Sequence, residues 1–200
     1  MPKKVSLLLI TCLLFFGCLE TPVYGITKPA ITQKIMITQG PSYFFNDVIS
    51  TLKVIQEVAP SDYILITRSI NKLILTDKTI GPSIGGWAEY RTNNVYLVKS
   101  NYINMKYNLG IHDNYGFGAV SQNITMQQMM AAFLIHEATH IKQFKAGTVK
   151  NTETAELEID AVNAERALLT KMGCSQELIE SMAGFDKINT RWWHEIVPAK

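Results

Sequence analysis

The sequence has few cysteines, no long apolar run and no excess of charge of one sign. Only 3 of its 200 residues are cysteine, too few for the disulfide framework that stabilises many small secreted domains. Its most apolar stretch, residues 5–16, is about a dozen residues long, whereas a membrane-spanning helix needs roughly 20. These absences exclude a disulfide scaffold and predict no membrane span in the mature chain.

The N-terminal stretch is typical of a secretory signal peptide. Lys3 and Lys4 precede the apolar run, and small and polar residues follow it, which is the layout of an export signal. We interpret residues 1–25 as this signal and residues 26–200 as a single domain. The alternative is a lipoprotein cleavage that leaves a lipid anchor at Cys18. The expected location is secreted, periplasmic or in the cell envelope.

The charge of the mature chain is nearly balanced. Removing residues 1–25 takes away Lys3, Lys4 and Glu20, which reduces 19 basic and 17 acidic side chains to 17 and 16. No basic cluster remains, so we expect no binding to nucleic acid and none to an anionic membrane surface. With 47% apolar residues, the chain can form one sizeable core.

The first half of the mature chain combines helix and strand patterns. Apolar spacing and turn residues predict two helices, a short strand and a hairpin, at residues 42–59, 61–70, 73–75 and 87–98. Ser61 and Asp62 are candidate caps for the second helix, and one longer strand could replace that helix and the short strand. Residues 100–123, rich in Asn, Tyr and Gly, are predicted as a long ordered loop.

The second half is predicted to be mainly helical. Thr125 and Gln128 form a capping-box pattern, and Gly147 ends the helix that they begin. A second long helix ends at Gly173, and two shorter helices are expected at residues 175–182 and 187–196. The fold class is therefore α+β, with a small antiparallel sheet packed on a pair of long helices.

The first long helix carries the motif His136-Glu137-Ala-Thr-His140. Residues four apart project from one helix face, so both imidazoles can reach one metal ion. Zinc suits this pair, and a catalytic zinc site has three protein ligands and an open position. Glu137, about 100° round the helix, can accept a proton at that position. The alternative is a pair of hydrogen-bonded core histidines beside a solvated glutamate.

The second long helix offers the third ligand. Glu156 and Asp160 are four residues apart, so one can bind the metal while the other accepts a hydrogen bond from a ligating histidine. Glu158, about 200° round the helix from Glu156, is expected to point away. The competing interpretation of these acidic residues is a solvated helix face.

These residues resemble the gluzincins, zinc metallopeptidases of the thermolysin type. The resemblance rests on His136-Glu137-x-x-His140 and Glu156-x-x-x-Asp160, and it is strongest to small bacterial members with H-E-x-x-H-x-x-Q followed by E-x-E-x-D-A. It implies that His136, His140 and Glu156 bind zinc, that Glu137 is the general base and that Asp160 supports a histidine. It also implies that the strand near residues 95–98 lies along the substrate cleft.

Two features depart from related patterns. Gln143 and Ala146 stand where metzincins have glycine and a third histidine. No downstream histidine matches the usual stabiliser of the transition state, and the candidates for that role are His112, Tyr115, Tyr102 and His194.

The sequence therefore predicts an exported zinc-dependent metallopeptidase. It would hydrolyse peptide bonds of a peptide or protein substrate through a zinc-activated water, with Glu137 as general base. The alternative is a non-catalytic, zinc-stabilised binding protein of the cell envelope, whose site would be closed by a fourth protein ligand. An exported toxin or effector protease is a third interpretation.

Overall fold

The computed structural model describes residues 36–80, 85–107, 124–147 and 155–181. Helices and a small sheet alternate in the first half, and helices alone make up the rest, so the predicted α+β class is confirmed. The expected signal peptide, Cys18 and the helix expected at 187–196 lie outside the described residues. None of the helices in the described ranges is long and apolar enough to cross a membrane.

The four strands form one mixed sheet. They are β1 (Met36–Gln39), β2 (Lys72–Thr76), β3 (Gly86–Glu89) and β4 (Asn94–Val98), in the order β1-β2-β4-β3. The predicted hairpin is confirmed, because β3 pairs antiparallel with β4. The rest of the sheet differs from the antiparallel prediction, since β2 pairs parallel with both β1 and β4. The two helices between β1 and β2 supply the crossover that parallel pairing requires.

Those two helices are α1 (Ser42–Val58) and α2 (Pro60–Ser69), as predicted. Phe44, Val48, Leu52 and Ile55 lie on one face of α1 and are buried. α2 begins with proline in its first turn, a position that suits the fixed φ of proline. Neither Ser61 nor Asp62 supplies a side-chain cap.

The prediction of a loop over residues 100–123 is wrong for its first part, which forms α3 (Lys99–Tyr107). Tyr102 and Met105, three residues apart, are buried, so packing overrides a composition that favours loops. Residues 108–123 lie outside the described part of the chain.

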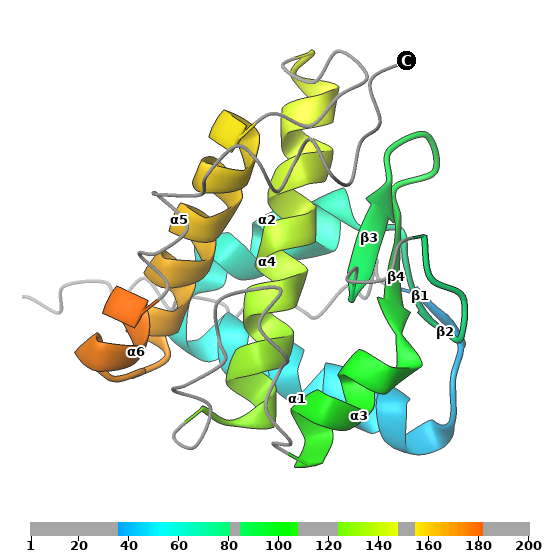
Figure 1. Ribbon diagram of the computed structural model, residues 1–200, viewed down its shortest axis with the longest axis horizontal. Coiled ribbons are helices and arrows are strands. Elements are labelled where there is room, and N and C mark those ends of the chain that lie inside the picture. Colours follow the sequence, from blue (N-terminus) through cyan, green and yellow to red (C-terminus); the bar gives the residue numbers. More distant parts are fainter. Residues whose placement is uncertain (1–35, 81–84, 108–123, 148–154, 182–200) are drawn as a thin grey trace, which may run out of the picture. The chain divides into compact units, whose positions relative to one another are not determined.

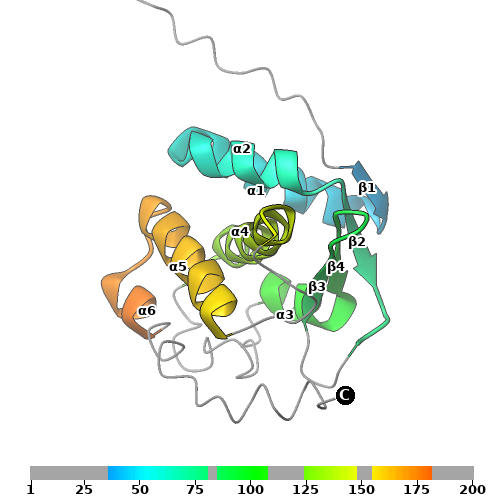
Figure 2. The same ribbon diagram turned by 90° about the horizontal axis from the view of Figure 1, so that it is seen from above.

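Helix α4 (Met126–Lys145) runs through the middle of the fold, between α5 on one side and the sheet on the other (Figures 1 and 2). Its start is confirmed by a complete capping box between Thr125 and Gln128. Gly147, which follows the helix, has a φ of 73°, a conformation that glycine adopts at little cost. α5 (Ala155–Lys171) runs antiparallel to α4, and the short α6 (Gln176–Ser181) follows it (Figure 1).

The hairpin approaches α4 closely at Gly86. A Cβ atom there would lie 2.3 Å from the ring of Phe133 and 2.7 Å from the carbonyl oxygen of Tyr96, so only glycine fits. β4 is paired on both sides, and within the described residues the sheet edge beside α4 is β3. The strand expected along a substrate cleft, residues 95–98, is therefore interior.

Candidate metal centre

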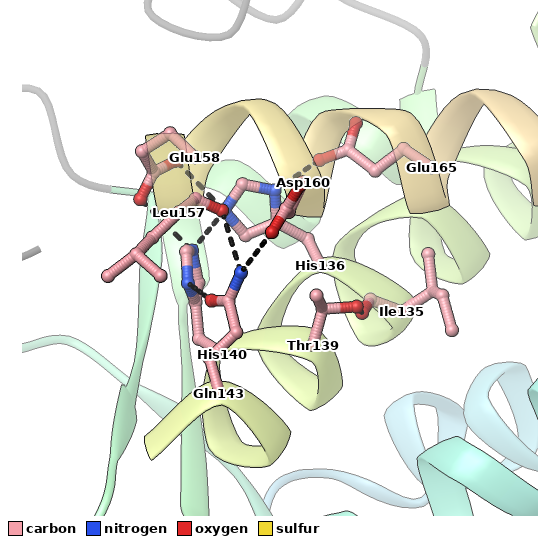
Figure 3. A network of polar contacts seen from close by, with 9 residues as sticks. All are labelled: Ile135, His136, Thr139, His140, Gln143, Leu157, Glu158, Asp160 and Glu165. Carbon is pink, nitrogen blue, oxygen red and sulfur yellow. Dashed lines mark hydrogen bonds and ion pairs between the residues drawn. The ribbon is translucent and has the colours of Figure 1, made fainter. Parts of the chain in front are cut away.

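Three side chains from α4 and α5 converge on one point. The Nε2 atoms of His136 and His140 are 2.9 Å apart, and the Glu158 carboxylate lies 3.3 Å from the first and 3.0 Å from the second. One ligand atom from each residue lies within 4.8 Å of the others. Figure 3 shows both rings and the carboxylate pointing toward each other.

The two helices place these groups for simple geometric reasons. His136 and His140 are one turn apart on α4, so their rings project side by side, with centroids 4.6 Å apart. α5 packs along the same face of α4 and presents Glu158 from its first turns. All three side chains are largely shielded from solvent, with exposed fractions of 9%, 3% and 13% for His136, His140 and Glu158.

The other ring nitrogens are held by different partners. The Nδ1 atom of His136 contacts the carboxylate of Glu165, a buried residue of α5. The Nδ1 atom of His140 lies 3.0 Å from Oε1 of Gln143. Because carboxylate and amide oxygens are acceptors, each Nδ1 must carry its hydrogen. Both Nε2 atoms therefore face the shared point.

With both histidines neutral, this arrangement gathers acceptors, and no described residue supplies a donor to them. A neutral imidazole with hydrogen on Nδ1 presents a lone pair at Nε2, so two lone pairs and an anionic carboxylate meet in a buried space. Burial lowers the pKa of His136, but Glu165 and Glu158 outweigh burial and raise it well above its usual value. Burial likewise raises the pKa of Glu158, but hydrogen bonds and charge from the two histidines in their protonated form hold it well below its usual value. A cation at this point, either a proton or a metal ion, is what the cluster favours.

The donor set fits a divalent metal. Two imidazole nitrogens and one carboxylate oxygen are ligands of zinc and of several other transition metals. The hydrogen bonds on both Nδ1 atoms orient the rings and strengthen them as ligands. Within the described ranges, no other set of three or more His, Cys, Asp or Glu side chains is arranged to hold an ion.

The structure does not bring Glu156, the expected third ligand, to the histidine pair. Glu156 is exposed, and Glu158 takes the position beside the pair. The two residues lie about 200° apart on α5, so only one can face α4. The buried side of α5 decides which one, and it includes Leu157, Ala161, Val162, Glu165, Leu168 and Leu169. Glu158 lies three, four and seven residues before Ala161, Val162 and Glu165, which is the spacing of residues on one helix face. This spacing is the signal in the sequence that could have identified both Glu158 and Glu165.

Asp160, expected to support a histidine, lies one step further out. It is exposed, and its carboxylate accepts a hydrogen bond of 3.4 Å from Nε2 of Gln143. Gln143 in turn contacts His140. The direct partners of the Nδ1 atoms are therefore Glu165 and Gln143, and Asp160 reaches His140 only through the amide.

Glu137 is buried next to the cluster, with an exposed fraction of 4%. Burial raises the pKa of its carboxyl, and the nearby charges of His136 and His140 oppose this shift only in part. No described residue donates a hydrogen bond to this carboxylate. Glu137 is therefore a buried acid with no structural partner in the described part of the chain, within electrostatic reach of both histidines.

Tyr102, the candidate for stabilising a transition state that lies in the described residues, is not found at the centre. The Tyr102 hydroxyl donates to Asp47 at 2.6 Å, between α3 and α1. His112, Tyr115 and His194 lie outside the described residues.

Comparisons with known proteins give no further assignment: no family model, no curated protein and no solved structure matches this chain. The chemistry of the centre must be inferred from its own residues.

Proposed function

We propose that this chain is an exported zinc-dependent hydrolase of peptide bonds, with His136, His140 and Glu158 as the metal ligands and Glu137 as the general base. The observation that carries the proposal is the meeting of two Nε2 atoms and one carboxylate, with both Nδ1 atoms already engaged. A histidine pair with a purely structural role would not favour this arrangement, because the nitrogen lone pairs of the two rings then face each other.

Zinc supplies Lewis acidity and lowers the pKa of a coordinated water toward about 7. The protein ligands number three among the described residues, which is the number found in catalytic zinc sites; structural sites have four. That count favours a position open to solvent or substrate.

Glu137 provides the proton transfers that hydrolysis needs. The pKa of Glu137 is raised in the direction of neutral pH. A general base whose pKa is closer to the working pH both accepts and returns protons efficiently. In the proposed reaction it takes a proton from the attacking water and delivers it to the leaving amine. The support for this role is its position beside His136, together with the lack of any described donor that would make it structural.

The test compares the full chain with Glu137→Gln on a mixed peptide library. The variant is expected to bind zinc like the wild type and to lose about 10²- to 10⁴-fold in cleavage rate, the usual contribution of a general base. A control at an exposed glutamate of α5, Glu156→Gln, should retain cleavage. Equal cleavage by wild type and Glu137→Gln would count against the peptidase and leave the metal centre standing.

The burial of the cluster favours a second candidate, a non-catalytic protein stabilised by zinc at the cell envelope. A metal that binds only the folded state adds its binding free energy to stability. This candidate predicts a large fall in melting temperature on chelation and no cleavage of any library peptide. The peptidase predicts that cleavage disappears with the metal and returns when zinc is restored.

A further inference from the structure

We infer that Gln143 is a positioning residue that orients His140 for the metal and joins that ligand to the docking of α5. The inference deepens the proposed function and rests on its metal centre. Gln143 is buried, with an exposed fraction of 8%, and it lies one turn beyond the second histidine on α4 (Figure 3).

The orientation of the Gln143 amide is set by the backbone of α5. Its Nε2 atom lies 3.1 Å from the carbonyl oxygen of Leu157, and a carbonyl can only accept hydrogen bonds. The NH₂ group of Gln143 must therefore face Leu157. A second acceptor, the Asp160 carboxylate at 3.4 Å, lies on the same side.

The opposite end of the amide then determines the hydrogen on His140. Oε1 of Gln143 faces Nδ1 of His140 at 3.0 Å, and an amide oxygen can only accept. His140 must carry its hydrogen on Nδ1, which leaves Nε2 for the metal. The choice of tautomer is thus passed from a backbone carbonyl of α5 through one side chain to a ligand on α4.

The consequence is that His140 is correctly oriented only when α5 is docked. Leu157 belongs to the same turns of α5 as Glu158, so one movement of that helix would remove both the third ligand and the anchor of the second. The pairing of His136 with His140 does not itself depend on α5, because both residues lie on α4.

The experiment measures zinc affinity by competition with a chromophoric chelator, and the His140 ring ¹⁵N shifts in the zinc-free full chain. Gln143→Met removes the hydrogen bonds to His140, Leu157 and Asp160 at similar volume. Gln143→Glu keeps an acceptor for Nδ1 but loses the donor to Leu157. The control is Thr139→Val, which removes a buried hydrogen bond of 2.8 Å to Ile135 within the same helix.

We expect a hydrogen on Nδ1 of His140 in the wild type and in Thr139→Val. Gln143→Met should show a mixture of tautomers and bind zinc about 10- to 100-fold more weakly, as is usual for outer partners of a ligand. Gln143→Glu should keep the tautomer and still lose affinity.

Two results would overturn the inference: an Nδ1 of His140 that carries no hydrogen in the wild type, or equal zinc affinity in Gln143→Met and Thr139→Val. If Gln143→Met does not fold, Gln143→Glu tests the affinity. A wild type that binds no zinc would refute the proposed metal centre as well. A wild type that binds zinc with no effect at position 143 would refute the inference alone.

Discussion

Two partly buried polar clusters lie on different helix pairs of this protein, and they differ in how their acceptors are satisfied. Between α1 and α3, the Asp47 carboxylate accepts from the Tyr102 hydroxyl at 2.6 Å and from the Lys106 ammonium at 2.8 Å. Between α4 and α5, two imidazole nitrogens and the Glu158 carboxylate meet, and the described part of the chain supplies no matching set of donors.

The difference separates a structural cluster from a candidate binding centre. The Asp47 cluster brings its own cation and its own hydroxyl donor, so it needs nothing from solvent. The cluster at His136 and His140 has an excess of acceptors that only a proton or a metal ion can neutralise. A buried polar cluster therefore indicates a binding centre most clearly when its own side chains do not balance its charge.

The largest effect on zinc affinity should come from substituting, one at a time, the two acidic residues that are candidates for the third ligand. Glu158→Gln should weaken zinc binding by more than about 100-fold, since even outer partners cost up to that amount. Glu156→Gln, at an exposed position on the other side of α5, should leave affinity unchanged. A chelator competition assay measures both, and the reverse order of effects would restore Glu156 as the ligand.

The pH dependence of stability should differ between the zinc-free and zinc-loaded protein. In the zinc-free state the pKa of His136 is raised by Glu165 and Glu158 against the effect of burial. A raised pKa stabilises the fold below the unfolded value of about 6.5, and this contribution is lost as pH rises through the folded value.

The zinc-free protein should therefore melt at lower temperature as pH rises above neutral, while zinc protects the loaded protein. The lowered pKa of Glu158 affects stability at acidic pH. Its contribution to stability is present above the unfolded pKa and is lost as pH falls through the folded pKa. Thermal melts across pH, with and without a chelator, measure this. Parallel curves would contradict the account.

A smaller effect is expected from breaking the structural cluster. Asp47→Ala leaves the Tyr102 hydroxyl without its acceptor, at a residue with an exposed fraction of 1%. The free energy of unfolding should fall by about 1–3 kcal/mol, measured by urea denaturation of the zinc-free protein. Zinc affinity should not change. A parallel loss of zinc binding would show that the two clusters are coupled.

The smallest effect should follow Tyr102→Phe, which removes one donor and keeps the Lys106 partner of Asp47. The expected loss is about 0.5–1.5 kcal/mol. Burial, together with the hydrogen bond and charge of Asp47, raises the pKa of Tyr102 far above its usual value, so the hydroxyl remains a donor at all moderate pH values. Urea denaturation should give the same loss at about pH 6 and at about pH 9, because the hydroxyl stays protonated at both values. A loss that vanished at the higher pH would contradict this assignment.

Local patterns predicted the parts of this protein that depend on one segment at a time. The capping box at Thr125 and the pairing of His136 with His140 each depend on a single helix, and the structure has both. Helix α3 was missed because its stability comes from the burial of Tyr102 and Met105, which a loop-like composition conceals.

The partners from α5 were harder to predict because they depend on which side of that helix faces α4. Four carboxylates occur between Glu156 and Glu165, and a change of phase by two residues exchanges Glu156 for Glu158. The apolar residues Ala161 and Leu168 lie on the buried side and carry the phase in the sequence. The roles of Gln143 and Glu165 depend on contacts between helices, which spacing alone does not give.

The central claim is that His136, His140 and Glu158 share one divalent ion. Its most direct test is metal analysis of the purified full chain after zinc loading and removal of weakly bound ions, compared with a His136→Ala, His140→Ala double variant. We predict one zinc ion per chain in the wild type and none in the double variant. Equal zinc content in both proteins would contradict the claim.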